Sequence, residues 1–121
     1  MGWNFWWAAG LTLACGMVSG QASAGDQKQI SGIAAYYSEG YKGKTASGAL
    51  YDPNKFTAAH LTLPFGTQLH ITDIKTRRSV TVIVNDRGPY TKGRVIDLSL
   101  AAAKALHMID RGLIQVTAAV Q

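Results

Sequence analysis

The chain has 121 residues, enough for one domain, and its 12 lysines and arginines against 7 aspartates and glutamates give a formal net charge of +5. A single cysteine excludes a disulfide framework within the chain. The positive charge suits an anionic partner, such as cell-wall carboxylates, phosphate-bearing polymers or nucleic acid, or serves solubility alone.

The first 24 residues have the pattern of a signal peptide. They contain no charged side chain, an apolar run over residues 5–18, and the small-residue sequence Ala-Ser-Ala at 22–24. The apolar run, about 14 residues, is shorter than the ~20 that a membrane-spanning helix needs, although the usual basic start of a signal peptide is absent. We therefore expect residues 1–24 to be removed on export to the cell envelope or periplasm, and residues 25–121 to form one domain.

Cys15 lies inside this leader and offers lipid attachment as an alternative. Ala14 supplies the small residue before it, but Thr12 stands where such sites usually carry an aliphatic residue. We favour cleavage after Ala24, so membrane attachment as an outer-membrane lipoprotein is expected only if Cys15 is lipidated. Export also makes nucleic acid the least expected of the anionic partners, and we predict none.

Short apolar runs separated by turns make up the rest of the chain. Residues 30–38 predict a strand, and the glycine-rich segment 39–48 predicts a loop. Turn sequences at 52–54 and 64–66 leave room for a helical turn between them.

Two alternating segments predict the most secure hairpin of the chain. Leu69 and Ile71 alternate with polar residues, the polar segment 75–78 forms a tight turn, and the valines of 79–85 then share one face.

The C-terminal part predicts a strand, a helix and a last strand. Residues 94–98 read as a strand, and Ser99 is placed to cap a helix over the alanine- and leucine-rich residues 100–108. Residues 112–120 close the chain as a strand. The chain is thus predicted to be mainly β, with about six short strands and one or two short helices, closed into a small barrel without exposed edges.

Few classes of chemical site fit the residues that are present. The chain has no Gly-x-Ser-x-Gly elbow, no cysteine after the leader and no glycine-rich phosphate loop after a strand. His60, His70 and His107 lack the spacing of metal ligands. We therefore expect no metal and no cofactor, and look to carboxylates near a histidine.

Asp86 is the candidate general acid or base. It follows the apolar segment V-T-V-I-V-N, and apolar surroundings favour a protonated carboxyl, whereas the neighbouring Arg87 favours the charged form. The structural alternative is that Asp86 only organises the turn before Gly88-Pro89.

Three other polar residues also have structural alternatives. His60 suits the role of a core histidine, and Asp52, which precedes Pro53, suits the start of a turn. Asp97, two residues before the predicted cap Ser99, is most simply a capping or helix-dipole residue.

The chain resembles the rare lipoprotein A (RlpA)-like domain family. The resemblance rests on T-A-S-G at residues 45–48, T-A-A-H-x-T-L-P-F-G-T at 57–67 and N-D-R-G-P-Y at 85–90, and it extends over residues 32–120. It implies a six-stranded double-psi β-barrel, the fold of expansins and of the catalytic domain of one class of lytic transglycosylases.

The resemblance implies a peptidoglycan lytic transglycosylase. Such an enzyme cleaves the β-1,4 bond between N-acetylmuramic acid and N-acetylglucosamine in glycan strands stripped of stem peptides. The C6 hydroxyl of the muramic acid displaces the leaving group and leaves a 1,6-anhydro end. One acid/base can then suffice, where hydrolytic glycosidases use two carboxylates. A non-catalytic expansin-like module that binds or loosens wall polymers, and an inhibitor or protein-interaction barrel, stay open as alternatives.

By motif, the resemblance implies a catalytic group of three residues and a substrate-binding group of three. The catalytic group is Asp86, His60 and Asp52, and the substrate-binding group is Tyr51, Arg87 and Thr45. Five tyrosines are also available to stack on sugars: Tyr36, Tyr37, Tyr41, Tyr51 and Tyr90. The expected partner is a peptidoglycan glycan strand, and the expected state is a monomer.

The chain departs from the family at Ala49, where a glutamate is usual. Glu39, in the same loop system, is a candidate replacement for that carboxylate. The departure leaves the rate of the reaction, and the activity itself, open to test.

Overall fold

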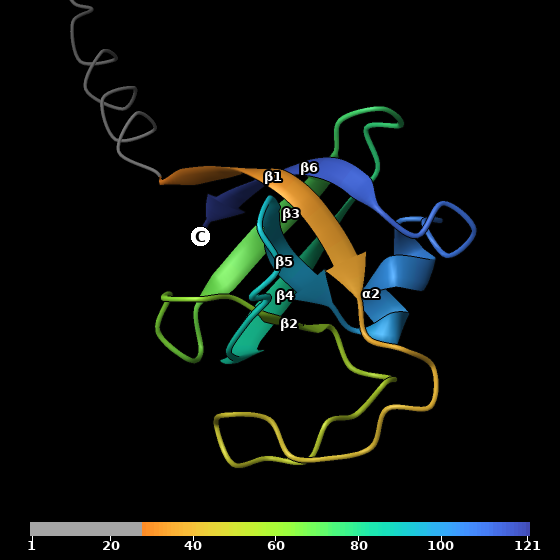
Figure 1. Cartoon of the computed structure of the whole chain (residues 1–121). Helices are drawn as coiled ribbons and strands as arrows, with labels where there is room; N and C mark the ends of the chain where they lie inside the picture. Colours follow the sequence, from red (N-terminus) through yellow and green to blue (C-terminus); the bar gives the residue numbers. More distant parts are fainter. Residues whose placement is uncertain (1–27) are drawn as a thin grey trace, which may run out of the picture.

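The computed structural model describes residues 28–121, so the predicted leader and its Cys15 lie outside the described residues. The described part is mainly β, as predicted, with six strands and one short helix (Figure 1). The strands are β1 (Gln29–Tyr36), β2 (Thr57–Ala59), β3 (Gln68–Asp73), β4 (Ser79–Asp86), β5 (Arg94–Leu98) and β6 (Ile114–Val120), and the helix is α2 (Leu100–Ala105).

The six strands close into a barrel in the order β1-β5-β2-β4-β3-β6. Strand β5 lies between β1 and β2, and β4 lies between β2 and β3. Each is therefore inserted between two strands that precede it in the sequence. These insertions produce the two parallel pairs, β1·β5 and β2·β4, whereas the other four neighbouring pairs are antiparallel. Closure leaves no unpaired strand edge, and the predicted double-psi barrel is confirmed.

The predicted hairpin is β3–β4. Leu69 pairs with Val82 and Ile71 with Val80, and Leu69, Ile71 and Val82 are buried in the barrel interior. A shift of one residue would turn these side chains to the outside, so the alternating pattern determines the register.

Strand β2 corrects the expectation of a helical turn between residues 54 and 64. Ala58 pairs with Val84 of β4 on one side and with Leu98 of β5 on the other. A three-residue segment has little intrinsic preference of its own, and here it takes the conformation that closes the barrel between two longer strands.

Helix α2 is shorter than the predicted helix over 100–108. Ser99 caps it as expected, because its hydroxyl oxygen accepts a hydrogen bond from the Ala102 amide at 3.3 Å. The helical path stops at Leu106, and His107 adopts a left-handed conformation with φ of 54°. Ala102, Ala103 and the buried Leu106 join the core of the barrel.

The segment between β1 and β2 is the longest connection in the described residues. It runs along one side of the barrel, on the side where β4 ends (Figure 1, orange to yellow). Ala35 and Ala59 are buried at 4% and 2% exposure, yet they lie outside the barrel core, next to residues whose side chains point inward.

An ion pair between exposed Arg111 and buried Asp73 joins the β3–β4 turn to the loop before β6. The Arg111 guanidinium donates to the Asp73 carboxylate, which is 1% exposed and also accepts from the Lys75 amide and the Thr76 hydroxyl. Burial by itself would raise the pKa of Asp73, but these hydrogen bonds and the Arg111 charge outweigh it and hold the pKa below its ordinary value.

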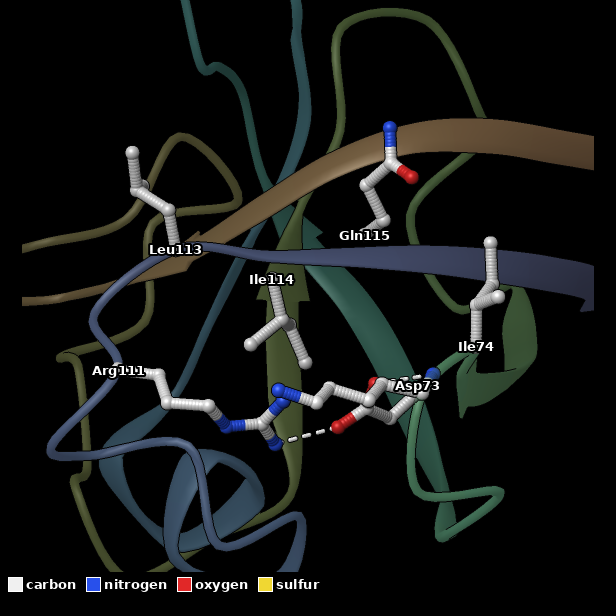
Figure 2. Close-up of a pocket in the computed structure, with 7 residues that line it drawn as sticks. Asp73, Ile74, Arg111, Leu113, Ile114 and Gln115 are labelled. Carbon is white, nitrogen blue, oxygen red and sulfur yellow. Dashed lines mark hydrogen bonds and ion pairs between the residues drawn. The ribbon is translucent and has the colours of Figure 1, made fainter.

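The same pair forms one wall of a pocket of about 450 Å³, with Leu113 and Ile74 at its sides (Figure 2). This pocket lies far from Asp86. Thr72, next to Asp73, pairs with Ser79 at the start of β4, whereas Asp86 is the last residue of that eight-residue strand. The ion pair therefore links β3 to the loop before β6, at the end of the barrel opposite to Asp86.

Asp73→Asn is expected to lower the free energy of unfolding by about 2 kcal/mol at pH 7, because it removes the charged acceptor of the Arg111 hydrogen bond. The pKa of Asp73 is lowered on folding, so its stabilising effect is complete above the unfolded value, near 3.9, and is lost as pH falls through the folded value. Denaturant titrations between pH 7 and pH 3 should therefore show the two proteins converging at low pH. Asp110→Asn, an exposed neighbour with the same charge change, is the control; equal effects of the two substitutions would contradict the assignment.

Candidate functional site

Asp86 is the last residue of β4 and its carboxylate is half-buried. Oδ1 accepts hydrogen bonds from the amides of Ala46, at 2.7 Å, and Arg87, at 2.8 Å. Oδ2 accepts one from the Tyr37 hydroxyl at 2.5 Å. Hydrogen bonds to a charged acceptor are short and strong, so the carboxylate is held in one orientation by three donors from three parts of the chain.

Tyr37, which follows β1, is the partner of Asp86 that sequence reasoning missed. Burial raises the pKa of Tyr37, and the hydrogen bond and charge of Asp86 raise it further, followed by the charges of Asp97 and Tyr41. The phenol therefore stays protonated and acts as a donor. The sequence pattern showed only an aromatic residue at a strand end, because the contact spans 49 positions along the chain.

A cluster of three tyrosines holds this phenol in place. The rings of Tyr37 and Tyr51 stack at 4.4 Å with an interplanar angle of 16°, and Tyr41 packs against both. The Tyr51 hydroxyl accepts a hydrogen bond from the Leu100 amide at 3.0 Å, and Tyr51 is only 8% exposed. Burial raises its pKa, as does the charge of Asp52, against the effect of the Leu100 hydrogen bond. Substrate binding by Tyr51 stays a prediction, since its ring already stacks on Tyr37.

His60 follows β2 and lies beside the end of β4, where its amide donates to the Asp86 carbonyl at 3.2 Å. Its Nδ1 accepts from the amides of Thr62 and Leu63, both at 3.1 Å. Burial lowers the pKa of His60, and the positive charges of Arg87 and Lys28 lower it further. The imidazole is therefore neutral, with its proton on Nε2, and presents an N–H donor.

Arg87 clamps the loop that carries His60. Its Nη1 donates to the carbonyls of His60, at 3.2 Å, and Leu63, at 2.8 Å, and its guanidinium lies 4.2 Å from the centre of the Phe65 ring. These contacts combine hydrogen bonding with a cation–π interaction. They give Arg87 a structural role in positioning His60, and its predicted contact with substrate is untested.

Thr45 holds the loop that reaches Asp86. It is 4% exposed, and both its amide and its hydroxyl donate to the Ala49 carbonyl, at 2.8 and 3.0 Å. Two residues on, the Ser47 amide donates to the Asn85 carbonyl at 3.2 Å. The loop is thereby fixed with the Ala46 amide against Asp86 and with Ala49 exposed at its edge. Substrate binding by Thr45 likewise stays a prediction.

Asp52 begins a turn. Its Oδ1 accepts from the Asn54 amide at 2.9 Å, and its carbonyl accepts from the Lys55 amide at 3.2 Å. This geometry matches the structural alternative for Asp52. It adjoins the site through its neighbour Tyr51, which stacks on Tyr37, so a catalytic role remains a prediction.

Asp97 is a strand residue of β5, which corrects its expected role as a capping residue. It pairs with Arg94 at 3.0 Å, and the hydroxyl of Ser99 caps α2 instead. Ala59 of β2 pairs with Asp97 on one side and with Asp86 on the other, so the two carboxylates flank one small residue.

The turn after Asp86 depends on Gly88. Its φ of 126° is allowed for glycine and strained for other residues. Space is not the constraint, because a Cβ there would meet only the Tyr90 ring, at an ordinary contact distance of 3.7 Å. Gly88 is buried and precedes a cis peptide bond to Pro89, and Tyr90 is 81% exposed. The backbone conformation of the turn therefore explains this glycine better than a close approach of substrate.

A cluster of metal-ligating side chains and a membrane-spanning helix are both absent from residues 28–121. No three histidine, cysteine, aspartate or glutamate side chains gather there in the manner of metal ligands. None of the helices described is long and apolar enough to cross a membrane.

Comparison with known proteins gives consistent matches. The sequence model of a family described as lytic transglycolase matches residues 29–118. A probable endolytic peptidoglycan transglycosylase RlpA of Treponema pallidum is 47% identical over 96 residues, which cover 78% of this chain and 30% of that protein. The endolytic peptidoglycan transglycosylase RlpA of Pasteurella multocida is 48% identical over 83 residues, covering 68% and 28%. The chain thus spans less than a third of these relatives.

Two solved structures are similar in fold. A Streptomyces papain inhibitor superposes with a TM-score of 0.62 at 26% identity, covering 78% of this chain and 96% of the inhibitor. The expansin of Clavibacter michiganensis superposes with a TM-score of 0.60 at 25% identity, covering 78% of this chain and 50% of the expansin.

At pH 7, His60 is expected to be neutral with its proton on Nε2, because Nδ1 accepts two amide hydrogen bonds; long-range ¹⁵N–¹H NMR spectra report this tautomer. The pKa of His60 is lowered on folding. The stabilising effect of the neutral His60 on the fold is therefore complete above the ordinary pKa of 6.5 and is lost as pH falls through the pKa of the folded protein. Hydrogen-exchange protection of the Thr62 and Leu63 amides should fall over that range. The Gly66 amide, bonded to the Val84 carbonyl, is the control. A proton on Nδ1 at pH 7 would disprove the assignment.

Proposed function

Because the chain belongs to the lytic transglycosylase family of double-psi β-barrel domains, we propose that it cleaves the β-1,4 bond between N-acetylmuramic acid and N-acetylglucosamine in peptidoglycan. The substrate is a glycan strand stripped of stem peptides, and the product carries a 1,6-anhydro end. The observation that carries the proposal is Asp86, a half-exposed carboxylate oriented by three donors beside a neutral histidine.

One carboxyl group accounts for both proton transfers of this reaction. Protonated Asp86 gives its proton to the glycosidic oxygen as the bond from that oxygen to C1 breaks. The resulting carboxylate then takes the proton of the C6 hydroxyl as O6 bonds to C1. Asp86 ends in its starting state, and no water is consumed.

The donors around Asp86 support the step in which it becomes charged. The Ala46 and Arg87 amides and the Tyr37 hydroxyl are in place before the carboxylate forms, so they stabilise the charge without reorganisation. The neutral His60 supplies a further N–H donor for the sugar. Tyr90, with its exposed ring four residues after Asp86, is suited to stacking on a sugar face.

A wall-binding module without catalysis is the second candidate. Its support is the fold shared with the Clavibacter michiganensis expansin, together with Ala49 at a position where the family usually has a carboxylate. The likeness to a papain inhibitor keeps the inhibitor alternative in view. Product analysis separates the transglycosylase from both alternatives, because only the transglycosylase releases 1,6-anhydro ends. Binding to sacculi then separates the wall-binding module from the inhibitor.

Asp86→Asn is expected to reduce the release of anhydro-glycans from stripped sacculi by at least about 100-fold, because the amide has no transferable proton. The melting temperature should change little, since the amide oxygen still accepts from both backbone amides and its NH₂ group reaches the Tyr37 oxygen. Mass spectrometry of the released glycans is the measurement.

Asp86→Ala is the matched comparison, because it removes all three hydrogen bonds and should lower the melting temperature as well. Full cleavage by a folded Asp86→Asn protein would exclude Asp86 as the acid/base. Binding of the wild-type protein to stripped sacculi without any anhydro product would favour the wall-binding module.

We also propose that the protein acts as a monomer in the cell envelope, after removal of residues 1–24. The support is the Ala-Ser-Ala sequence at 22–24 and the imperfect lipid-attachment sequence at Cys15. The intact mass of the exported protein should correspond to a chain that begins at Gly25. A lipid-modified species that begins at Cys15 would establish membrane attachment instead.

A further inference from the structure

We propose that Tyr37 is the positioning residue of the acid/base, and that it selects Oδ2 of Asp86 as the oxygen that exchanges the catalytic proton. The inference deepens the proposed function and rests on it. It concerns the same carboxylate but a residue to which neither the motifs nor the family resemblance gave a role at Asp86.

The first argument is the difference between the two oxygens of Asp86. Oδ1 accepts from two backbone amides, at 2.7 and 2.8 Å, which belong to the loop and to the turn and cannot rotate away. Oδ2 has a single protein donor, the Tyr37 hydroxyl at 2.5 Å. A hydroxyl can turn from donor to acceptor by rotation about one bond, so only Oδ2 can carry a proton without breaking the backbone contacts.

The second argument is that the ring of Tyr37 is immobilised. It stacks at 4.4 Å on Tyr51, whose hydroxyl is held by the Leu100 amide at the start of α2. Tyr41 packs against both rings. The hydroxyl of Tyr37 therefore has one accessible motion, its own rotation, and Oδ2 stays at a constant position relative to the barrel.

The third argument is the charge around the pair. The groups that act on Tyr37 are Asp86 at the end of β4, Asp97 in β5 and Tyr41 in the loop after β1. The charge of Arg87 is directed to the neutral His60 and its loop instead. Burial and the two carboxylates raise the pKa of Tyr37 well above its ordinary value. The phenol thus remains protonated at every pH at which the enzyme works, and its hydroxyl can donate to the Asp86 carboxylate or accept from the protonated carboxyl.

Tyr37→Phe is the test, because it removes the hydroxyl and keeps the ring that stacks on Tyr51. Tyr36→Phe is the matched control: its hydroxyl donates to the Ile109 carbonyl at 2.8 Å and has no contact with Asp86. Two readouts are needed, the pH–rate profile on stripped glycan and the pH titration of the Asp86 carboxyl carbon by ¹³C NMR.

Loss of one hydrogen bond to the carboxylate should move the protonation midpoint of Asp86 upward in Tyr37→Phe. The limb of the pH–rate profile that depends on Asp86 should move by the same amount, with kcat at the optimum reduced about tenfold and KM unchanged. Tyr36→Phe should change neither midpoint nor profile.

An unmoved protonation midpoint of Asp86 in Tyr37→Phe would overturn the proposal. A lower kcat and a lower melting temperature with that unmoved midpoint would show that Tyr37 contributes packing alone. If the wild-type protein releases no anhydro product, the transglycosylase proposal fails by itself. The ¹³C titration would still decide whether Tyr37 sets the charge of Asp86.

Discussion

The carboxylate of Asp86 accepts three hydrogen bonds that together join the end of β4, the residue after β1 and the loop around Ala46. Without these bonds the long segment between β1 and β2 would keep only its aromatic packing and a few backbone contacts to the barrel. A buried carboxylate is unfavourable unless it is well hydrogen-bonded, so the loop and the carboxylate stabilise each other. The residue best placed for chemistry is also the one on which the architecture of the site depends.

The barrel provides the rigidity that such an arrangement requires. Because β5 and β4 are inserted between strands formed earlier in the chain, residues distant in sequence are brought into one continuous sheet. Ala59 of β2 thereby lies between Asp86 and Asp97. The Asp86 carboxylate therefore lies on a closed barrel without free edges, and its three hydrogen bonds fix its orientation relative to that barrel.

Several polar residues of the family motifs turn out to hold the site together. Arg87 secures the His60 loop, Thr45 shapes the loop that carries Ala46, and Asp52 starts a turn beside Tyr51. His60 uses one ring nitrogen to hold its own loop, which leaves the other as a donor. A residue type that is suited to chemistry is equally suited to satisfying backbone groups, and only the contacts distinguish the two uses.

Local pattern was sufficient for much of the fold. Alternation of apolar and polar residues determined the β3–β4 hairpin and its register. Ser99 and the alanines after it determined the start of α2, and the apolar run before Asp86 placed that residue at the end of β4. The tertiary structure decided the rest. Strand β2 exists because two longer strands leave a gap between them, Ala59 of that strand lies between Asp86 and Asp97, and Tyr37 meets Asp86 from 49 positions away. The physical reason is range: periodicity and capping act between residues a few positions apart, whereas strand insertion and the pairing of a phenol with a carboxylate depend on distances that exist only once the barrel has closed.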